Sequence, residues 1–92
     1  MSFVSNYGVI SVGTNATLIL AANNERKGSL IFNNSNQTVF LGMDTSVTTS
    51  NGLPLVASGT FNNSGQNEVW KGAIYGIVAG TTADCRFWEF GP

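Results

Sequence analysis

Side chains that could perform acid–base chemistry are few and scattered along this chain. Histidine, the most common general acid and base in enzymes, is absent. The carboxylates stand apart from one another, so the sequence contains no paired-carboxylate site of the kind that cleaves glycosidic bonds. They are Glu25, Asp44, Glu68, Asp84 and Glu89. The sequence therefore predicts a protein that is not an enzyme.

Thiol chemistry rests on a single cysteine, Cys85. It alternates with Phe87 along an apolar stretch, which indicates a small buried core residue rather than a reactive thiol. One cysteine without histidine cannot provide a zinc site. Asp44 lacks the further spaced carboxylates of a calcium loop. No phosphate-binding or dinucleotide-binding glycine motif is present, so we expect no metal and no cofactor.

Aromatic side chains in the C-terminal third are the best candidates for contact with a partner. Such rings stack on sugars, and they are also preferred anchors of protein interfaces. We favour the interface and keep carbohydrate recognition as the alternative. The residues concerned are Trp70, Tyr75, Trp88 and Phe90.

The N-terminal segment, residues 1–8, is polar but carries three apolar anchors: Phe3, Val4 and Tyr7. It lacks the basic and apolar regions of a signal peptide, so we expect the protein to be made in the cytoplasm. A loose polar segment with apolar anchors is suited to ordering on a neighbouring molecule. We therefore take residues 1–8 as a candidate arm and residues 9–92 as a single domain.

The composition narrows the range of partners. Only 10% of residues are charged and the net charge is −1, whereas 42% are hydrophobic. Nucleic acid is not expected as a partner, because phosphate binding needs clustered basic residues and this chain has only Arg26, Lys27, Lys71 and Arg86. The longest apolar run, residues 18–22, is too short to cross a bilayer, so we expect no membrane association.

Short apolar runs separated by Gly, Asn, Ser and Thr predict about eight strands and no helix. Such spacing is typical of an all-β protein, here a small two-sheet antiparallel sandwich of jelly-roll type. We expect Leu18 and Leu20 to share one face of their strand, and Leu30 and Phe32 to point into the core. The expected strands cover residues 9–12, 17–21, 29–33, 38–43, 57–61, 68–70, 73–78 and 83–90, with an extended segment at 53–55 and a turn at 62–65.

Two of these expected strands, residues 73–78 and 83–90, carry bulky apolar side chains on both faces. A strand that is apolar on both faces is normally covered on both faces. In a domain this thin, the second cover would be a neighbouring subunit. We therefore expect a homo-oligomer.

Residues 16–90 resemble the small β-sandwich virion proteins of tailed bacteriophages. The resemblance rests on the order of strands and turns, and it is carried by residues 16–23, 26–30, 33–34 and 39–42, by VTTSNGLPL at 47–55, by WKGAIYGI at 70–77 and by ADCRFWE at 83–89. Two features depart from it. Cys85, Phe87 and Trp88 stand where smaller aliphatic residues are expected, and residues 1–8 match no pattern of the family.

The resemblance implies a structural role in the virion, as a capsid decoration (cement) protein, a head fibre or a tail component, and it implies a trimer. We expect a decoration protein that binds the major capsid protein in its lattice. The alternative is a carbohydrate or host-receptor recognition module of a tail or fibre that uses Trp70, Tyr75 and Trp88.

Overall fold

The computed structural model describes residues 5–64 and 69–91, and this part of the chain is all β. Eight strands follow one another along the sequence. They are β1 (Ser5–Val12), β2 (Thr17–Leu20), β3 (Gly28–Asn33), β4 (Val39–Gly42), β5 (Leu53–Leu55), β6 (Thr60–Ser64), β7 (Ile74–Ile77) and β8 (Ala83–Phe90).

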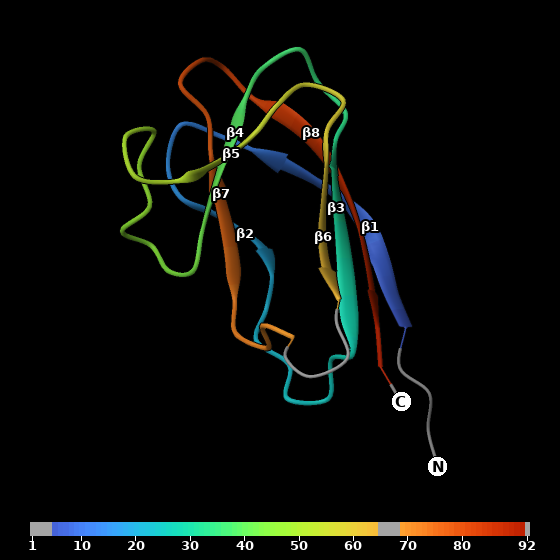
Figure 1. Ribbon diagram of the computed structural model, residues 1–92. Helices are drawn as coiled ribbons and strands as arrows, with labels where there is room; N and C mark the ends of the chain where they lie inside the picture. Colours follow the sequence, from blue (N-terminus) through green and yellow to red (C-terminus); the bar gives the residue numbers. More distant parts are fainter. Residues whose placement is uncertain (1–4, 65–68, 92) are drawn as a thin grey trace.

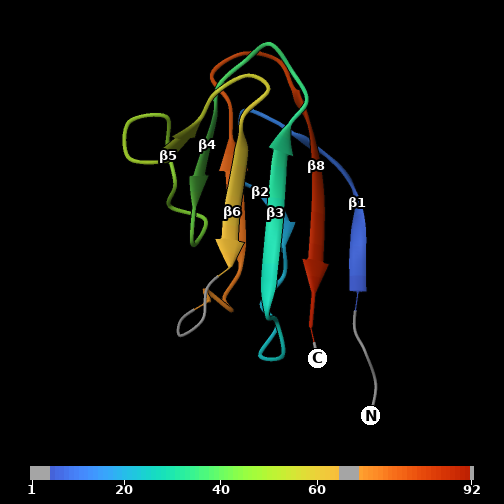
Figure 2. The ribbon, with the colours of Figure 1, turned by 45° about the vertical axis from the view of Figure 1, so that its right-hand side comes forward.

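The strands form two antiparallel sheets that face each other (Figures 1 and 2). The first sheet has the order β1-β8-β3-β6 and the second has the order β2-β7-β4-β5. Strand β1 pairs with β8, β2 with β7, β3 with β6 and β4 with β5, as if one long hairpin had been folded over on itself. This is the jelly-roll arrangement, so the predicted fold class is confirmed.

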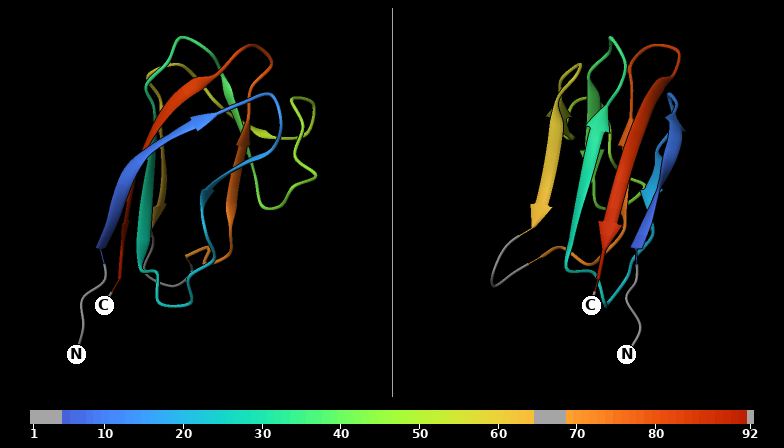
Figure 3. Two further views of the ribbon diagram at one scale, coloured as in Figure 1. Left: turned by 180° about the vertical axis from the view of Figure 1, so that it is seen from behind. Right: turned by 90° about the vertical axis from the view of Figure 1, so that its right-hand side faces the viewer.

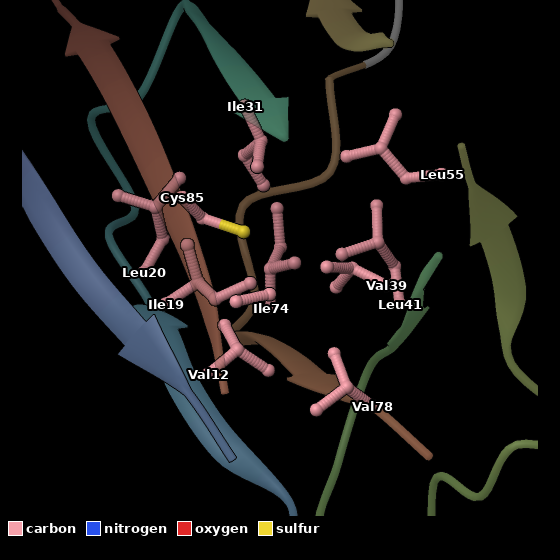
Figure 4. Close-up of a cluster of buried hydrophobic side chains, with 11 residues drawn as sticks. Val12, Ile19, Leu20, Ile31, Val39, Leu41, Leu55, Ile74, Val78 and Cys85 are labelled. Atoms are coloured by element: carbon pink, nitrogen blue, oxygen red, sulfur yellow. The ribbon is translucent and has the colours of Figure 1, made fainter. Parts of the chain in front are cut away.

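The space between the sheets is filled by aliphatic side chains from both of them (Figure 4). Val12, Ile31 and Cys85 of the first sheet are fully closed off from solvent and meet Val39 and Ile74 of the second. Side chains alternate along β7 and the residue after it, because Ile74 and Val78 are buried while Tyr75 and Ile77 are only half-buried. Cys85 is buried, as predicted.

The first strand starts earlier than expected. Residues 5–8 belong to β1 and pair with Phe90, Glu89, Trp88 and Phe87 of β8, so they are sheet and not arm. Strand β1 begins and β8 ends at the same end of the sandwich, as the view from behind shows (Figure 3). The long partner strand β8 explains the difference, because it provides a ladder for residues whose own sequence is too polar to predict a strand. Residues 1–4 of the predicted arm lie outside the described residues.

The sixth strand is also shifted. A turn closes at Val56–Gly59, where the Gly59 amide donates to the Val56 carbonyl at 2.8 Å and Ser58 has a φ of 63°. Residues 60–64 then pair with β3, although 62–65 were predicted as a turn. The strand predicted at 68–70 is absent from its described residues, 69 and 70, which lie in a loop.

Two predicted orientations are wrong. A bulge between Leu18 and Leu20 turns both Ile19 and Leu20 into the core and leaves Leu18 exposed. In β3 the inward residues are Ser29, Ile31 and Asn33, whereas Leu30 and Phe32 point outward. Three consecutive apolar residues at 30–32 fit either register, and the polar partners described below select the second one.

Candidate functional site

The outward side of the first sheet carries a row of large apolar side chains. Tyr7 of β1 lies directly beside Trp88 of β8, and Trp88 lies beside Leu30 of β3. Tyr7 is 76% exposed and Trp88 is 62% exposed. Two aromatic rings this exposed on adjacent strands of a monomer are unusual, because monomers rarely leave such groups together in water.

A second row on the same side joins the first. Val9, Arg86 and Phe32 are neighbours across β1, β8 and β3. Val9 is 60% exposed, and Phe32 is half-buried beside a shallow hollow of about 240 Å³ that Trp88 and Leu30 also line. We call this surface the outer apolar face, and it consists of Tyr7, Val9, Leu30, Phe32 and Trp88.

Arg86, which lies between Val9 and Phe32 within the outer apolar face, is neutralised by Asp84. The Arg86 guanidinium lies 3.1 Å from the Asp84 carboxylate two residues away on β8. Hydrogen bonds from Arg86 and from the Asn34 amide hold the pKa of the Asp84 carboxyl below its usual range. The face therefore presents apolar surface with almost no net charge.

The inward side of β3 shows why the apolar residues point outward. Ser29 and Asn33 are fully buried there, and each is hydrogen-bonded. The Asn33 amide donates to the carbonyls of Gln37 (2.6 Å) and Leu55 (2.9 Å), and the Ser29 hydroxyl accepts from the Asn63 amide at 3.2 Å. Because buried polar groups need such partners, this register of β3 satisfies Ser29 and Asn33 while it also buries Ile31.

Glu89 of β8 belongs to the same inward polar set. Its carboxylate accepts from the Arg26 Nε at 2.6 Å, and Arg26 is fully buried. The other guanidinium nitrogens donate to the carbonyls of Trp70 (2.9 Å), Gly72 (2.9 Å) and Ala21 (2.6 Å). This ion pair ties two loops to the last strand, and the sequence analysis missed it because the partners are far apart in the chain.

Trp70 is held in place by the same contacts. Its amide donates to the Asn63 side-chain oxygen at 3.1 Å, its carbonyl accepts from the Asn63 amide at 3.0 Å, and its indole N–H donates to the Ala73 carbonyl at 2.9 Å. The side chain stands at the border of a cleft of about 500 Å³, which Leu53 of β5 and Phe61 of β6 also line. Trp70 is thus fixed at a cleft on the opened edge of the sandwich.

The outward side of the second sheet is apolar as well, but the chain covers part of it. Phe40, Tyr75 and Ile77 are half-buried there. The loop between β4 and β5 folds back over this side, and Val47 of the loop is buried. Gly42 and Gly52 permit the approach, since a Cβ at Gly42 would lie 2.4 Å from Val47 and one at Gly52 would lie 2.6 Å from Phe40.

The structure therefore separates the residues that we selected as an interface. Tyr7, Trp88 and Phe90 lie on the outward side of the first sheet, where Phe90 is half-buried. Trp70 borders the cleft, and Tyr75 lies on the outward side of the second sheet. Trp70, Tyr75 and Trp88 do not form one stacking platform for a carbohydrate. Phe3 and Val4 lie outside the described residues.

Three residues of the outer apolar face escaped the sequence analysis: Val9, Leu30 and Phe32. Leu30 and Phe32 were placed in the core because apolar residues usually point there. A usable signal was present in Ser29 and Asn33, which flank them at the positions that alternate with them. Ser29 and Asn33 are four positions apart and therefore share one face of the strand. Two polar residues on one face of a strand that pairs on both sides indicate a polar network on the inward side.

The described carboxylates occupy separate places and serve separate partners. Asp44 accepts from the backbone and the hydroxyl of Ser46, Asp84 pairs with Arg86, and Glu89 pairs with Arg26. Within residues 5–64 and 69–91, no three metal-ligating side chains gather in one place. Burial, with a smaller contribution from Asp84, raises the pKa of the Cys85 thiol to about 11, which leaves it protonated at neutral pH.

Comparison with known proteins adds no family to this description. No protein-family model, curated protein or solved structure matches the chain. In the part of the chain that the structure describes, no helix has the length and apolar character needed to span a membrane.

Proposed function

We propose that the chain is a non-enzymatic structural protein of a bacteriophage virion, namely a capsid decoration protein that assembles as a homo-oligomer and binds the major capsid lattice. The observation that carries the proposal is the outer apolar face, in which Tyr7 and Trp88 stand exposed side by side. The resemblance of residues 16–90 to phage virion proteins supplies the biological setting, and it favours a trimer.

The size of the outer apolar face supports a role in assembly. Aromatic side chains bury about 150–250 Å² each, so the exposed parts of Tyr7 and Trp88 together amount to roughly 300 Å². One partner of a standard protein interface contributes about 800 Å². With Val9 and the surrounding polar rim, the face can provide the apolar centre of an interface of that size.

The chemistry of the face fits a second copy of this chain. Arg86 within the face is paired with Asp84, so a copy can approach without strong like-charge repulsion. The apolar rings would lose their contact with water in the oligomer, which is the main driving force for association. A second copy would then cover the outward apolar face of β8, as expected for a strand that is apolar on both faces.

Binding to a capsid lattice asks for little from any single contact. Many copies on a regular shell, each held through an oligomer, convert modest affinities into durable attachment. A surface with few charges can lie against the shell without a large desolvation penalty.

The test combines oligomeric state with capsid binding. The wild-type protein should sediment as a multiple of its 9.7 kDa chain and should co-sediment with capsids that lack it. The double variant Tyr7→Ser/Trp88→Ser should stay folded by circular dichroism, become monomeric and lose capsid binding. The matched control, Met43→Ser/Val56→Ser, changes exposed apolar residues outside the face and should behave like the wild type.

Two results would overturn the proposal. One is a wild-type protein that is monomeric at micromolar concentration and never binds capsids. The other is a protein that ignores capsids but binds host polysaccharide, which would transfer the function to the carbohydrate-recognition class.

A further inference from the structure

The cleft at Trp70 has the dimensions and lining of a small-molecule site. Its volume of about 500 Å³ lies within the range of roughly 300–1,000 Å³ that is usual for ligand pockets. It opens at the edge of the sandwich, where β5 and β6 are the last strands of their sheets. Leu41, Phe61 and Ile74 give it apolar walls, and Ile74 is almost fully buried.

The indole N–H of Trp70 has a partner within the protein, so Trp70 contributes its ring to the cleft. The indole N–H is already donated to the Ala73 carbonyl. The six-membered part of the ring packs over Gly72, where a Cβ would lie 2.3 Å from the Trp70 Cζ2 atom. The Arg26 and Asn63 contacts fix the backbone of Trp70 from the other side. Trp70 is 43% exposed and held in position, so its ring is a preformed wall of the cleft.

Asp44 supplies the one charge among the described residues that line the cleft. Its Oδ1 atom accepts both the backbone and the hydroxyl hydrogen bond of Ser46, and these bonds lower the pKa of the carboxyl. The ion pairs within residues 5–64 and 69–91 are Arg26 with Glu89 and Arg86 with Asp84, so no described cation neutralises Asp44. A carboxylate that is in no ion pair with a described residue therefore borders an aromatic and apolar cleft.

We propose that this cleft binds a small organic cation, an ammonium group carried on a flat apolar body. The carboxylate of Asp44 attracts the ammonium group, and the apolar walls and the indole face of Trp70 cover the body. An aromatic face also attracts a cation through its quadrupole, so the two features favour the same ligand chemistry. The inference is independent of the capsid proposal, since the cleft and the outer apolar face share no residue.

The experiment compares three probes of similar shape and different charge by ¹⁵N–¹H correlation NMR: 2-phenylethylammonium, 2-phenylethanol and phenylacetate. The chain has two tryptophans, so their indole N–H signals separate the cleft (Trp70) from the outer apolar face (Trp88). The ammonium probe should shift the Trp70 signal and bind about fivefold more tightly than the alcohol. Phenylacetate should bind more weakly than either.

Three variants isolate the contributions. Asp44→Asn keeps an oxygen acceptor for Ser46 and should reduce the ammonium affinity to that of the alcohol, while the alcohol affinity stays unchanged. Gly72→Ala displaces the Trp70 ring and should weaken both probes. Asp84→Asn removes an exposed carboxylate outside the cleft and should change neither affinity.

The proposal is overturned if the ammonium and the alcohol bind equally, if Asp44→Asn leaves their ratio unchanged, or if none of the probes shifts the Trp70 signal at millimolar concentration. It is also overturned if glucose or a disaccharide shifts the Trp70 signal and the ammonium probe does not. That last result would place carbohydrate recognition at this cleft.

Discussion

The outward sides of the two sheets are both apolar, but a loop of the chain covers part of only one of them. The second sheet has Phe40, Tyr75 and Ile77 on that side, and the loop carrying the buried Val47 folds over part of it. The first sheet has Tyr7 and Trp88 on its outward side, and none of the described residues covers them. An apolar strand face by itself does not identify an interface. A sheet face becomes a candidate interface only when no other part of the same chain covers it.

The inward sides differ in the opposite direction. The second sheet turns aliphatic residues such as Val39 and Leu41 inward, as amphipathic strands usually do. The first sheet turns Ser29, Asn33 and Glu89 inward beside the apolar Val12, Ile31 and Cys85, and it satisfies each of the three polar residues with hydrogen bonds. The first sheet thus keeps polar groups inside while it leaves apolar rings outside. That inversion is the feature that assembly would explain.

The largest expected effect comes from breaking the polar network that holds the first sheet in its inverted register. Arg26→Met leaves the Glu89 carboxylate buried without its partner, so we expect a loss of about 3–5 kcal/mol in the free energy of unfolding. Urea denaturation followed by circular dichroism measures it. The control is Arg86→Met, which breaks an exposed ion pair and should cost less than about 1 kcal/mol. Equal losses would show that the buried pair does not hold the register.

The next effect tests whether the inward side of the first sheet is a sealed core. The pKa of the Cys85 thiol is raised to about 11 in the folded protein, against 9.0 for an unperturbed thiol. The unfolded state therefore loses this proton first as the pH rises. The stability contributed by the protonated thiol is complete below pH 9 and is lost between pH 9 and 11, by at most about 3 kcal/mol.

Urea denaturation at several pH values from 8 to 11 checks this loss, with Cys85→Ala as the reference for all other titrating groups. The wild type should lose more stability than the variant over this interval. Parallel curves for the two proteins would mean that the thiol is not sealed from solvent, and rapid modification by a thiol reagent at pH 8 would say the same.

A smaller effect concerns the cover on the second sheet. Val47→Ala removes two buried methyl groups between the loop and the strand, so we expect a loss of about 2 kcal/mol. Binding of a hydrophobic dye should increase, because Phe40 loses part of its cover. Val56→Ala is the exposed control and should change stability by less than about 0.5 kcal/mol. If Val47→Ala behaves like Val56→Ala, the loop is not an effective cover and the contrast between the two sheets disappears.

The smallest effect isolates the outer apolar face with a matched pair of valines. Val9 on the face is 60% exposed and Val56 elsewhere is 59% exposed. Val9→Thr should leave the free energy of unfolding within about 0.5 kcal/mol of the wild type. It should weaken self-association by about fourfold, since it replaces one buried methyl group by a hydroxyl. Sedimentation over a range of concentrations measures this, and Val56→Thr should not change it.

Much of the fold was predictable because it rests on local chemistry. Short apolar runs between Gly and Asn turns predicted the strands of β3, β4, β7 and β8 to within a residue or two. The burial of Cys85 followed from its alternation with Phe87. Polar segments such as residues 5–8 and 62–64 were mistaken for arm and turn, because their strand state comes from pairing with β8 and β3.

The candidate site was only half predictable. Tyr7 and Trp88 were selected as interface residues for their type, but their adjacency arises from a pairing between the first and last strands. Leu30 and Phe32 were assigned to the core, since nothing local distinguishes their outward register from the inward one. Trp70 was selected as an interface residue, with carbohydrate binding as the alternative, and its place at the cleft depends on Arg26 and Asn63.

The sequence by itself determined that this protein is all β and that it carries few charges, because these properties depend on residue type and short-range spacing. Only the tertiary structure decided which side of each strand is inside and which apolar side is left bare. The reason is physical: a strand's two faces are equivalent until distant partners choose between them. Here the inward face is selected by hydrogen bonds from Asn33 to backbone carbonyls and from Arg26 to the Glu89 carboxylate. The loop that carries Val47 covers one of the two outward faces and leaves the other bare.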